Sequence, residues 1–416
     1  MRDARLSPPQ TGLVLSGGGA RAAYQVGVLE AIADLRIACG LPRQNSPFQI
    51  LCGTSAGAIN ASALACGADH FDDAVRHMAR IWRGFRASQV YLADSISVLR
   101  SGAHWLTLLS LGWTVARWRK ARPHALLNNA PLADLLKQLV PLDRLPELIR
   151  DGHLHALAIT ASSYTSGEHV TFYESHAART PWIRSQRKSV RASISHAHLL
   201  ASSAIPFIFP ARAVSVDGQM HYLGDGSMRQ TAPIAPAIHL GAERILIVGA
   251  GRMYEPALPT QPDALPSYPS LAQIGGHALS SIFLDALSVD IERAERINQT
   301  LSLIPPDARA RSPLKPLELL VLSPSQRIDE IASRHVCELP ATIRALLGAV
   351  GVKDAANTPC NTGGPASVAG GAALASYLLF ESGFTQELIE LGRSDVSARR
   401  AEVCAFFGWR LPTETH

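Results

Sequence analysis

The chain has 416 residues, of which 47% are hydrophobic and 18% are charged, so it can bury a sizeable core and lacks the composition of a disordered protein. Its formal net charge is +5, and the basic residues are scattered apart from one cluster over 117–122. This charge is too small and too dispersed to favour nucleic-acid binding, but it suits contact with an anionic membrane surface. The first ten residues hold no apolar segment typical of a secretory signal, which predicts a cytoplasmic protein.

The first 70 residues predict a strand, a helix and a second strand. The apolar run 11–16 (TGLVLS) is typical of a strand, and apolar residues recur with helical spacing over 21–35. A second strand is predicted over 48–52 (FQILC), followed by an Ala-rich helix over 58–66. Two strands joined through one helix are expected to be parallel with a right-handed crossover, so their carboxyl ends lie at the same edge of the sheet.

The rest of the chain first repeats this pattern and then becomes mostly helical. Further strands are predicted over 154–160, 169–173, 220–223 and 244–248, with a helix over 190–202. Helices are predicted over 271–301, 328–347 and 371–391, and a loop rich in Gly and Pro over 357–371. We expect an α/β fold with a mostly parallel central sheet, comprising a domain over 11–252 with an insertion at about 88–127, and a helical extension over 253–416 packed on or next to it.

A serine lies in a glycine-bounded turn directly after the second predicted strand. The run from Gly53 to Gly57 (GTSAG) fits G-x-S-x-G, the nucleophile elbow, in which a strand turns sharply into a helix and exposes a serine hydroxyl. Small neighbours are required because the turn is tight. An apolar strand ends just before this run and an Ala-rich helix begins within it, so the context also predicts Ser55 as a nucleophile.

Three consecutive glycines end the first predicted strand. Gly17, Gly18 and Gly19 precede Ala20 and Arg21. Consecutive glycines allow backbone N–H groups to converge on one point, as an oxyanion hole requires. The same stretch also fits the dinucleotide-binding pattern G-x-G-x-x-A, so a nucleotide-binding or regulatory module is an alternative. That alternative expects an acidic residue at the end of the second strand, where this chain has the serine turn.

An aspartate follows the predicted strand 220–223 and opens an Asp-Gly turn. Asp225 should therefore project from a strand end, with Gly226 in the turn. His239 and His277 come later in the chain, so a serine, acid and histidine triad is an alternative arrangement. Neither histidine lies in a recognisable turn, and His239 sits in an apolar stretch typical of a helix or a core position.

These three motifs, in this order and spacing, resemble the patatin-like phospholipase family. Residues 200–206 (LASSAIP), followed by Phe209 and Pro210, also resemble the segment that precedes the catalytic acid of that family. The resemblance covers about residues 11–250 and implies a three-layer α/β/α fold. One departure is visible, because this chain has Ser227 where the family usually has Gly or Ala after Asp-Gly.

The resemblance also implies a serine and aspartate dyad in place of a triad, with Ser55 as the nucleophile and Asp225 as the base. The other matched positions form the oxyanion hole (Gly17, Gly18, Gly19) or support the motifs (Arg21, Gly53, Gly57, Gly226). The implied reaction is two-step acyl transfer from a phospholipid or another acyl ester. An acyltransferase and a catalytically inactive membrane adaptor remain alternatives.

The implied chemistry requires no cofactor, and the sequence predicts none. A serine and aspartate hydrolase does not depend on a metal ion. The six cysteines show neither a CxxC pair nor another metal-ligand spacing, so no metal site is expected.

The segment 99–120 is rich in Leu and Trp and ends in the basic cluster. It is too short and too interrupted to predict a bilayer span. Trp together with Arg and Lys suits the headgroup layer, which favours an interfacial helix that makes peripheral membrane contact. A lid or a core helix packed on the sheet is the alternative.

The C-terminal third carries no motif that predicts chemistry. A helical cap over the first domain and a dimerisation surface both stay open. Asp285, Asp290 and Glu292 are expected to form the solvated face of a helix.

Overall fold

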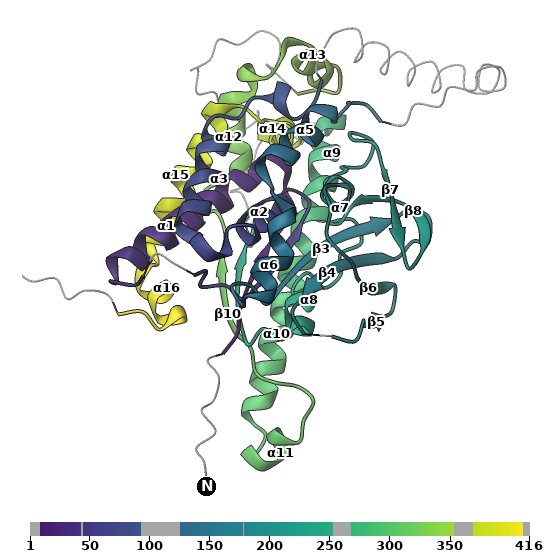
Figure 1. Cartoon of the computed structure of the whole chain (residues 1–416). Coiled ribbons are helices and arrows are strands. Elements are labelled where there is room, and N and C mark those ends of the chain that lie inside the picture. Colours follow the sequence, from purple (N-terminus) through teal and green to yellow (C-terminus); the bar gives the residue numbers. More distant parts are fainter. Residues whose placement is uncertain are drawn as a thin grey trace, which may run out of the picture.

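A computed structural model describes residues 9–42, 45–92, 125–177, 179–252, 268–352 and 369–410 (Figure 1). The segment 99–120, predicted to contact a membrane, lies outside the described residues. Most of the predicted insertion at 88–127 and most of the predicted loop at 357–371 also lie outside them.

The described strands form one sheet, in the order β10-β9-β1-β2-β3-β4-β6-β5, with β8 pairing with β3 and β7. The strands are β1 (Thr11–Leu15), β2 (Ile50–Thr54), β3 (Ala156–Ser163), β4 (His169–Ser175), β5 (Ile183–Arg184), β6 (Arg187–Arg191), β7 (Arg212–Val216), β8 (Gln219–Asp225), β9 (Arg244–Val248) and β10 (Glu318–Leu322). Neighbours from β10 to β3 are parallel, whereas β4 and β8 run antiparallel to β3. The six strands predicted from the sequence, β1, β2, β3, β4, β8 and β9, are confirmed.

The helices surround this sheet. They are α1 (Ala23–Ala38), α2 (Ala56–Ala65), α3 (Phe71–Arg83), α5 (Ala130–Leu139), α6 (Leu145–Arg150), α7 (His196–Ser202), α8 (Ala235–Leu240), α9 (Leu271–Ser280), α10 (Ala286–Ser302), α11 (Pro306–Ala310), α12 (Ile328–His335), α13 (Ala341–Ala349), α14 (Ala369–Ala375), α15 (Ser382–Ala398) and α16 (Arg400–Phe407). The predicted helix over 271–301 is confirmed as a continuous run in which a π-helical turn, Ser281–Asp285, joins α9 to α10.

The sheet is the middle layer of three. Leu13 and Leu15 of β1 pack with apolar side chains of α1, α2, α3 and α15 on one face. Val14, between them, points to the opposite face and packs with side chains of α8 and α10. Because both faces are covered, β1 and β2 are buried along their whole length and read as continuous apolar runs. The predicted fold class, with a mostly parallel central sheet, is confirmed.

Four predictions for single segments were wrong. The predicted helix over 190–202 begins only at His196, because 187–191 pairs with β4 as strand β6. The predicted helices over 328–347 and 371–391 are each two helices, and Pro340 breaks the first because it lacks a backbone N–H. Asp290 is buried on the sheet side of α10, where its carboxylate accepts the Ile234 N–H at 3.0 Å, so it is not solvated.

The C-terminal third contributes to the same core. Strand β10 extends the sheet beside β9, and α15 lies along α1 (Figure 1). The two helices approach closely through glycines, since a Cβ on Gly27 would lie 1.9 Å from the carbonyl oxygen of Ile389, and one on Gly392 would lie 2.4 Å from that of Tyr24. The division of the chain into domains near residue 252 stays a prediction.

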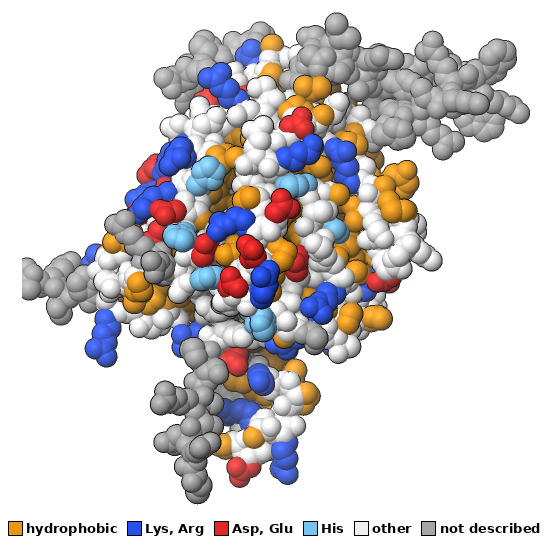
Figure 2. Space-filling model, in the orientation of Figure 1, with side chains coloured by type: hydrophobic (Ala, Val, Ile, Leu, Met, Phe, Trp, Pro, Cys, Tyr) orange, Lys and Arg blue, Asp and Glu red, His pale blue; other side chains and the backbone are white. Residues whose placement is uncertain are grey.

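The run Leu271–Ser302 is long and apolar enough, by length and composition alone, to cross a membrane. This is weak evidence, because core helices pass the same test, and Leu287, Ile291 and Ala294 of this run pack against the sheet. Figure 2 shows acidic and basic side chains interspersed on the viewed face, as expected from their scattered positions in the sequence.

The glycine contact between α1 and α15 predicts a large effect of one methyl group. Gly27→Ala should lower the free energy of unfolding by about 1 to 3 kcal/mol, because the added methyl meets a backbone carbonyl and forces the helices apart. Gly348→Ala is the matched control: it lies in α13 with open space around it, and it should raise stability by up to about 1 kcal/mol. Urea unfolding measures both, and equal effects of the two variants would contradict the packing described.

Candidate active site

Ser55 lies at a strained turn between β2 and α2. Its backbone has φ 55° and ψ −129°, a conformation that side-chain-bearing residues rarely adopt. A Cβ on Gly53 would lie 2.4 Å from the carbonyl oxygen of Gly57, and one on Gly57 would lie 2.4 Å from that of Leu15. Both glycines are therefore required by the close approach of backbone, as the elbow motif predicts.

The Ser55 hydroxyl meets the carboxylate of Asp225. Its Oγ donates to Asp225 Oδ2 at 2.5 Å, and the backbone N–H of Ser227 donates to Oδ1 at 2.9 Å. Asp225 ends β8 and is fully buried, and Ser55 is 1% exposed. A Cβ on Gly226 would lie 2.0 Å from the carbonyl oxygen of Thr160, so only glycine fits after the aspartate.

Burial raises the pKa of Asp225 to about 6. Removing a carboxyl group from water disfavours its charged form, while the hydrogen bonds from Ser55 and Ser227 favour that form and limit the rise. The carboxyl is therefore ionised at neutral pH. It is also a better proton acceptor than an ordinary exposed aspartate, which is what a general base needs.

The glycine run 17–19 after β1 lies beside the turn that follows Asp225 and beside the cavity that Ser55 lines. No acceptor among the described residues takes the N–H groups of Gly17, Gly18 or Gly19. Gly17 faces the Ser227 side chain, and Gly19 lines the same cavity as Ser55. Such amides can donate to an oxyanion that forms beside the serine.

The glycines are crowded on their other sides. Gly19 has a φ of 56°, and a Cβ there would lie 2.3 Å from the carbonyl oxygen of Tyr377. Arg21 points away from the dyad: its Nε donates to Ser376 Oγ at 2.7 Å, and its guanidinium lies 4.1 Å from the centre of the Tyr377 ring. Arg21 thus joins the glycine loop to the C-terminal third.

Ser202 holds the elbow in place. It lies in the segment 200–206, which stood out in the sequence only by its resemblance to the family. Its Oγ accepts the N–H of Ser55 at 2.9 Å and donates to the carbonyl oxygen of Thr160 at 2.6 Å. Its backbone carbonyl also accepts the N–H of Gly226 at 3.1 Å. One fully buried residue therefore connects the turn at Ser55, the centre of β3 and the turn after Asp225.

His169 of β4, which the sequence did not single out, fixes the aspartate's turn from the other side. Its Nε2 lies 2.9 Å from the carbonyl oxygen of Gly226. Burial lowers the pKa of His169 to about 4, so the ring is neutral at pH 7 and must carry its proton on Nε2 to donate this bond. The role of His169 is visible only from its contact with the Gly226 carbonyl. A single histidine in a predicted strand carries no pattern that would indicate such a role.

The two histidines considered as alternative bases lie elsewhere. His239 is on α8 and stacks on Trp182, with ring centres 4.7 Å apart. His277 is exposed on α9. The hydroxyl of Ser55 points to Asp225 and not to either ring.

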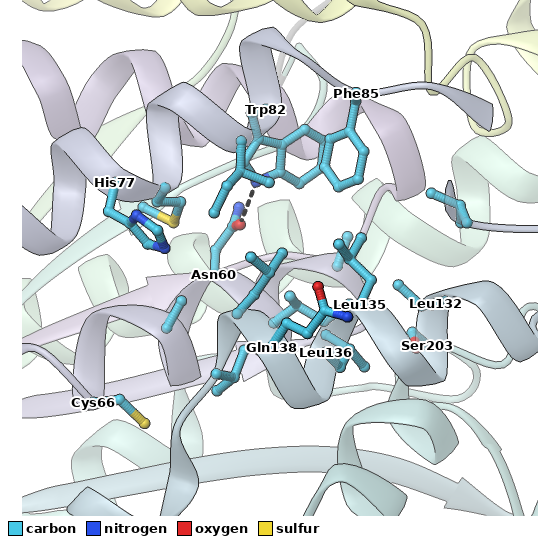
Figure 3. Close-up of a pocket in the computed structure, with 18 of the residues that line it drawn as sticks. Asn60, Cys66, His77, Trp82, Phe85, Leu132, Leu135, Leu136, Gln138 and Ser203 are labelled. Atoms are coloured by element: carbon cyan, nitrogen blue, oxygen red, sulfur yellow. Dashed lines mark hydrogen bonds between the residues drawn. The ribbon is translucent and has the colours of Figure 1, made fainter. Parts of the chain in front are cut away.

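A cavity of about 330 Å³ extends from Ser55 along α2. Figure 3 shows its apolar walls, with Trp82 of α3 and Phe85, just after this helix, on one side and Leu132, Leu135 and Leu136 of α5 across from them. Within these walls, the indole N–H of Trp82 donates to Asn60 Oδ1 at 2.9 Å (Figure 3), so these two polar groups are paired with each other. The cavity has the size and lining of a site for an apolar ligand.

In the part of the chain that the structure describes, no group of three or more His, Cys, Asp or Glu side chains could hold a metal ion.

A family model described as patatin-like phospholipase matches residues 13–238, more than half of the chain. The chain therefore belongs to the patatin-like phospholipase family, and by that membership it is a lipid ester hydrolase. The resemblance noted in the sequence is confirmed. No curated protein matches the chain.

Solved structures with a remote likeness include VipD from Legionella pneumophila and human GIVD cytosolic phospholipase A2. VipD is 13% identical with a TM-score of 0.32, over 92% of this chain and 67% of VipD. The human phospholipase is 10% identical with a TM-score of 0.42, over 98% of this chain and 64% of its own. This chain thus spans about two thirds of the length of either protein.

The contacts of Ser202 predict that its replacement lowers stability more than replacement of the next residue, Ser203. Ser202→Ala should lower the free energy of unfolding by about 2 to 4 kcal/mol, because the Ser55 N–H and the Thr160 carbonyl both lose a buried partner. Ser203→Ala is the matched control, since its Oγ only adds a bond to the Leu199 carbonyl within its own helix, and it should cost less than about 1 kcal/mol. Urea unfolding compares the two, and equal losses would contradict the bridging role.

Proposed function

We propose that the chain is a serine lipid acyl hydrolase, of the phospholipase A or lysophospholipase type, that uses Ser55 as nucleophile and Asp225 as general base. The single observation that carries this proposal is the 2.5 Å hydrogen bond between a buried serine hydroxyl and a carboxylate whose pKa is raised to about 6. A base that is ionised at neutral pH and in contact with the nucleophile's proton meets the geometric and chemical conditions for catalysis.

The reaction proceeds in two steps. Asp225 Oδ2 accepts the proton of Ser55 as Oγ attacks the ester carbonyl, and the N–H groups of Gly17, Gly18 and Gly19 stabilise the resulting oxyanion. The proton passes from Asp225 to the leaving oxygen as the ester bond breaks, which releases the alcohol or lysolipid. Water then attacks the acyl-enzyme, and Asp225 accepts its proton and returns it to Ser55.

Two features of the elbow assist this chemistry. Ser55 precedes the first turn of α2, so the positive end of the helix dipole favours the negative charge that develops near Oγ. The Ser55 amide is already bonded to Ser202, which fixes the direction of the hydroxyl before substrate binds.

The cavity along α2 supports an apolar acyl chain as the part of the substrate next to Ser55. Ile59 and Ala63 of α2 and Cys66, which directly follows the helix, line it at successive turns, so it extends about 16 Å from the serine at 1.5 Å of rise per residue. Its walls are mostly apolar, which suits a hydrocarbon chain and disfavours a charged group at depth.

A phospholipid substrate requires access to a membrane surface. We propose that the segment 99–120 supplies peripheral contact with the bilayer from a cytoplasmic protein, on the basis of its Trp, Leu and basic residues. Both the membrane contact and the cytoplasmic location stay predictions.

The dyad is tested by removing each partner separately. Ser55→Ala and Asp225→Asn should each lower kcat/KM for p-nitrophenyl esters and for phospholipid vesicles by about 10³-fold or more, because the nucleophile or its base is lost. Circular dichroism and thermal unfolding check that both variants stay folded, and His239→Ala and His277→Ala serve as controls. Near-normal rates in Asp225→Asn, or loss of activity in either histidine variant, would make the dyad assignment wrong. Adding acceptor alcohols and analysing the products separates hydrolysis from acyl transfer.

The acyl cavity is tested by blocking it part of the way along. Ala63 lies about 12 Å along α2 from Ser55, at 1.5 Å of rise per residue. Ala63→Trp should lower kcat/KM for p-nitrophenyl palmitate by about tenfold or more, because the indole fills space that a long chain needs. Hydrolysis of the butyrate ester should be nearly unchanged, and Ala63→Ser is the control for substitution at this position. Equal losses on both esters would place the acyl chain elsewhere.

A further inference from the structure

Ser227 occupies the gap between the carboxyl of Asp225 and the glycine loop. The residue is 3% exposed, and its backbone N–H donates to Asp225 Oδ1 at 2.9 Å. On its other side, a Cβ on Gly17 would lie only 2.2 Å from Ser227 Oγ, so this hydroxyl fills the space that the absent side chain of Gly17 leaves. The ring of Phe283 closes the same gap, at 2.9 Å from that Cβ position.

The Ser227 hydroxyl is buried and has no hydrogen-bond partner among the residues that the structure describes. A buried hydroxyl that stays unpaired is unfavourable, so its presence at this point calls for an acceptor. Gly17 offers no side chain, and Phe283 offers no acceptor oxygen. The acceptor two residues away is the Asp225 carboxylate, to which the Ser227 amide already donates.

A serine hydroxyl can donate to any acceptor within its reach, because rotation about the side-chain bonds redirects its O–H group. A carboxylate oxygen accepts more than one hydrogen bond, and a bond to an ionised acceptor is stronger than one to a neutral group. Ser227 lowers the pKa of Asp225 against the effect of burial.

We propose that Ser227 is a positioning residue of the dyad: its hydroxyl donates a second hydrogen bond to the Asp225 carboxylate and keeps that carboxylate ionised, with Oδ2 directed at Ser55. The proposal rests on the proposed function and deepens it. When Oδ2 accepts the serine proton, the charge on the carboxyl disappears and the bond from Ser227 weakens. The hydroxyl therefore favours the resting, ionised base and makes it available at lower pH.

The neighbouring ionisable groups do not provide this effect. Tyr164, after β3, has a pKa raised by burial and by Asp225 itself, so it stays neutral in the range of interest. His169 of β4 and His198 of α7 are both neutral at pH 7, since burial lowers each pKa to about 4. Arg229 is exposed and donates to backbone and amide oxygens near β6. Burial and hydrogen bonds, in that order, set the pKa of Asp225.

The experiment is the pH dependence of kcat/KM with p-nitrophenyl butyrate for the full chain. The wild type should lose activity below about pH 6, with the pKa of Asp225 as the midpoint. Ser227→Ala and Ser227→Gly both remove the hydroxyl, and each should move this midpoint upward by about one pH unit. Activity at pH 6 then falls several-fold, while activity at pH 8.5 stays close to the wild type. Ser227→Thr, which keeps a hydroxyl, should return the midpoint toward the wild-type value.

Ser62→Ala is the matched control, because Ser62 is also a fully buried serine whose hydroxyl has no partner among the described residues, but it lies within α2. Its midpoint should equal that of the wild type. The rate at which a fluorophosphonate labels Ser55, measured over the same pH range, gives a second readout of the same base.

The outcomes separate this proposal from the proposed function. If wild-type activity is present but the Ser227→Ala and Ser227→Gly midpoints do not move, or if activity falls equally at every pH, the role of Ser227 is overturned and the dyad stands. If Ser62→Ala shifts the midpoint as much as Ser227→Ala, the effect is not specific to this hydroxyl and the proposal fails. If the wild type neither hydrolyses esters nor reacts with the fluorophosphonate, the proposed function and this inference fall together.

Discussion

The site depends on keeping a buried carboxylate in contact with a buried hydroxyl. Burial raises the pKa of Asp225, and the hydrogen bonds from Ser55 and Ser227 limit the rise to about 6. Strand β3 fixes the distance between the two groups, because Thr54 pairs with Thr160 and Asp225 pairs with Ala161, the next residue. A one-residue slip of β2 or β8 against β3 would turn Ser55 or Asp225 to the other face of the sheet.

This arrangement needs backbone atoms in places where side chains cannot fit. Gly57 lies against β1, Gly226 lies against the carbonyl of Thr160, and Gly19 lies against that of Tyr377. Each close approach removes room for movement, so Ser55 and the amides of the glycine loop are held in position. The strained backbone of Ser55 persists because Ser202 and the two elbow glycines determine it together.

The C-terminal third completes the site although it carries no recognisable motif. The carbonyl of Tyr377 accepts the N–H of Ala20 at 3.1 Å, its ring lies under the guanidinium of Arg21, and Phe380 lines the cavity beside Ser55. The glycine loop is therefore held from a segment more than 350 residues away in the chain. Contacts of this kind are made by backbone atoms and by common side chains, which leave no pattern in a sequence.

The sequence by itself determined the βαβ start of the fold, the elbow and the glycine loop. Short apolar strands and glycines in tight turns are local requirements, so a short stretch of the sequence shows them directly. The sequence also indicated Asp225 as a candidate site residue, but only through the resemblance to the family, since an Asp-Gly pair is typical of any turn. The tertiary structure alone decided that Asp225 is buried against Ser55, that Ser202 and His169 hold the two turns, and that 187–191 pairs as a strand. These features depend on which strands become neighbours, and strand pairing is a property of the whole chain that no local window of residues contains.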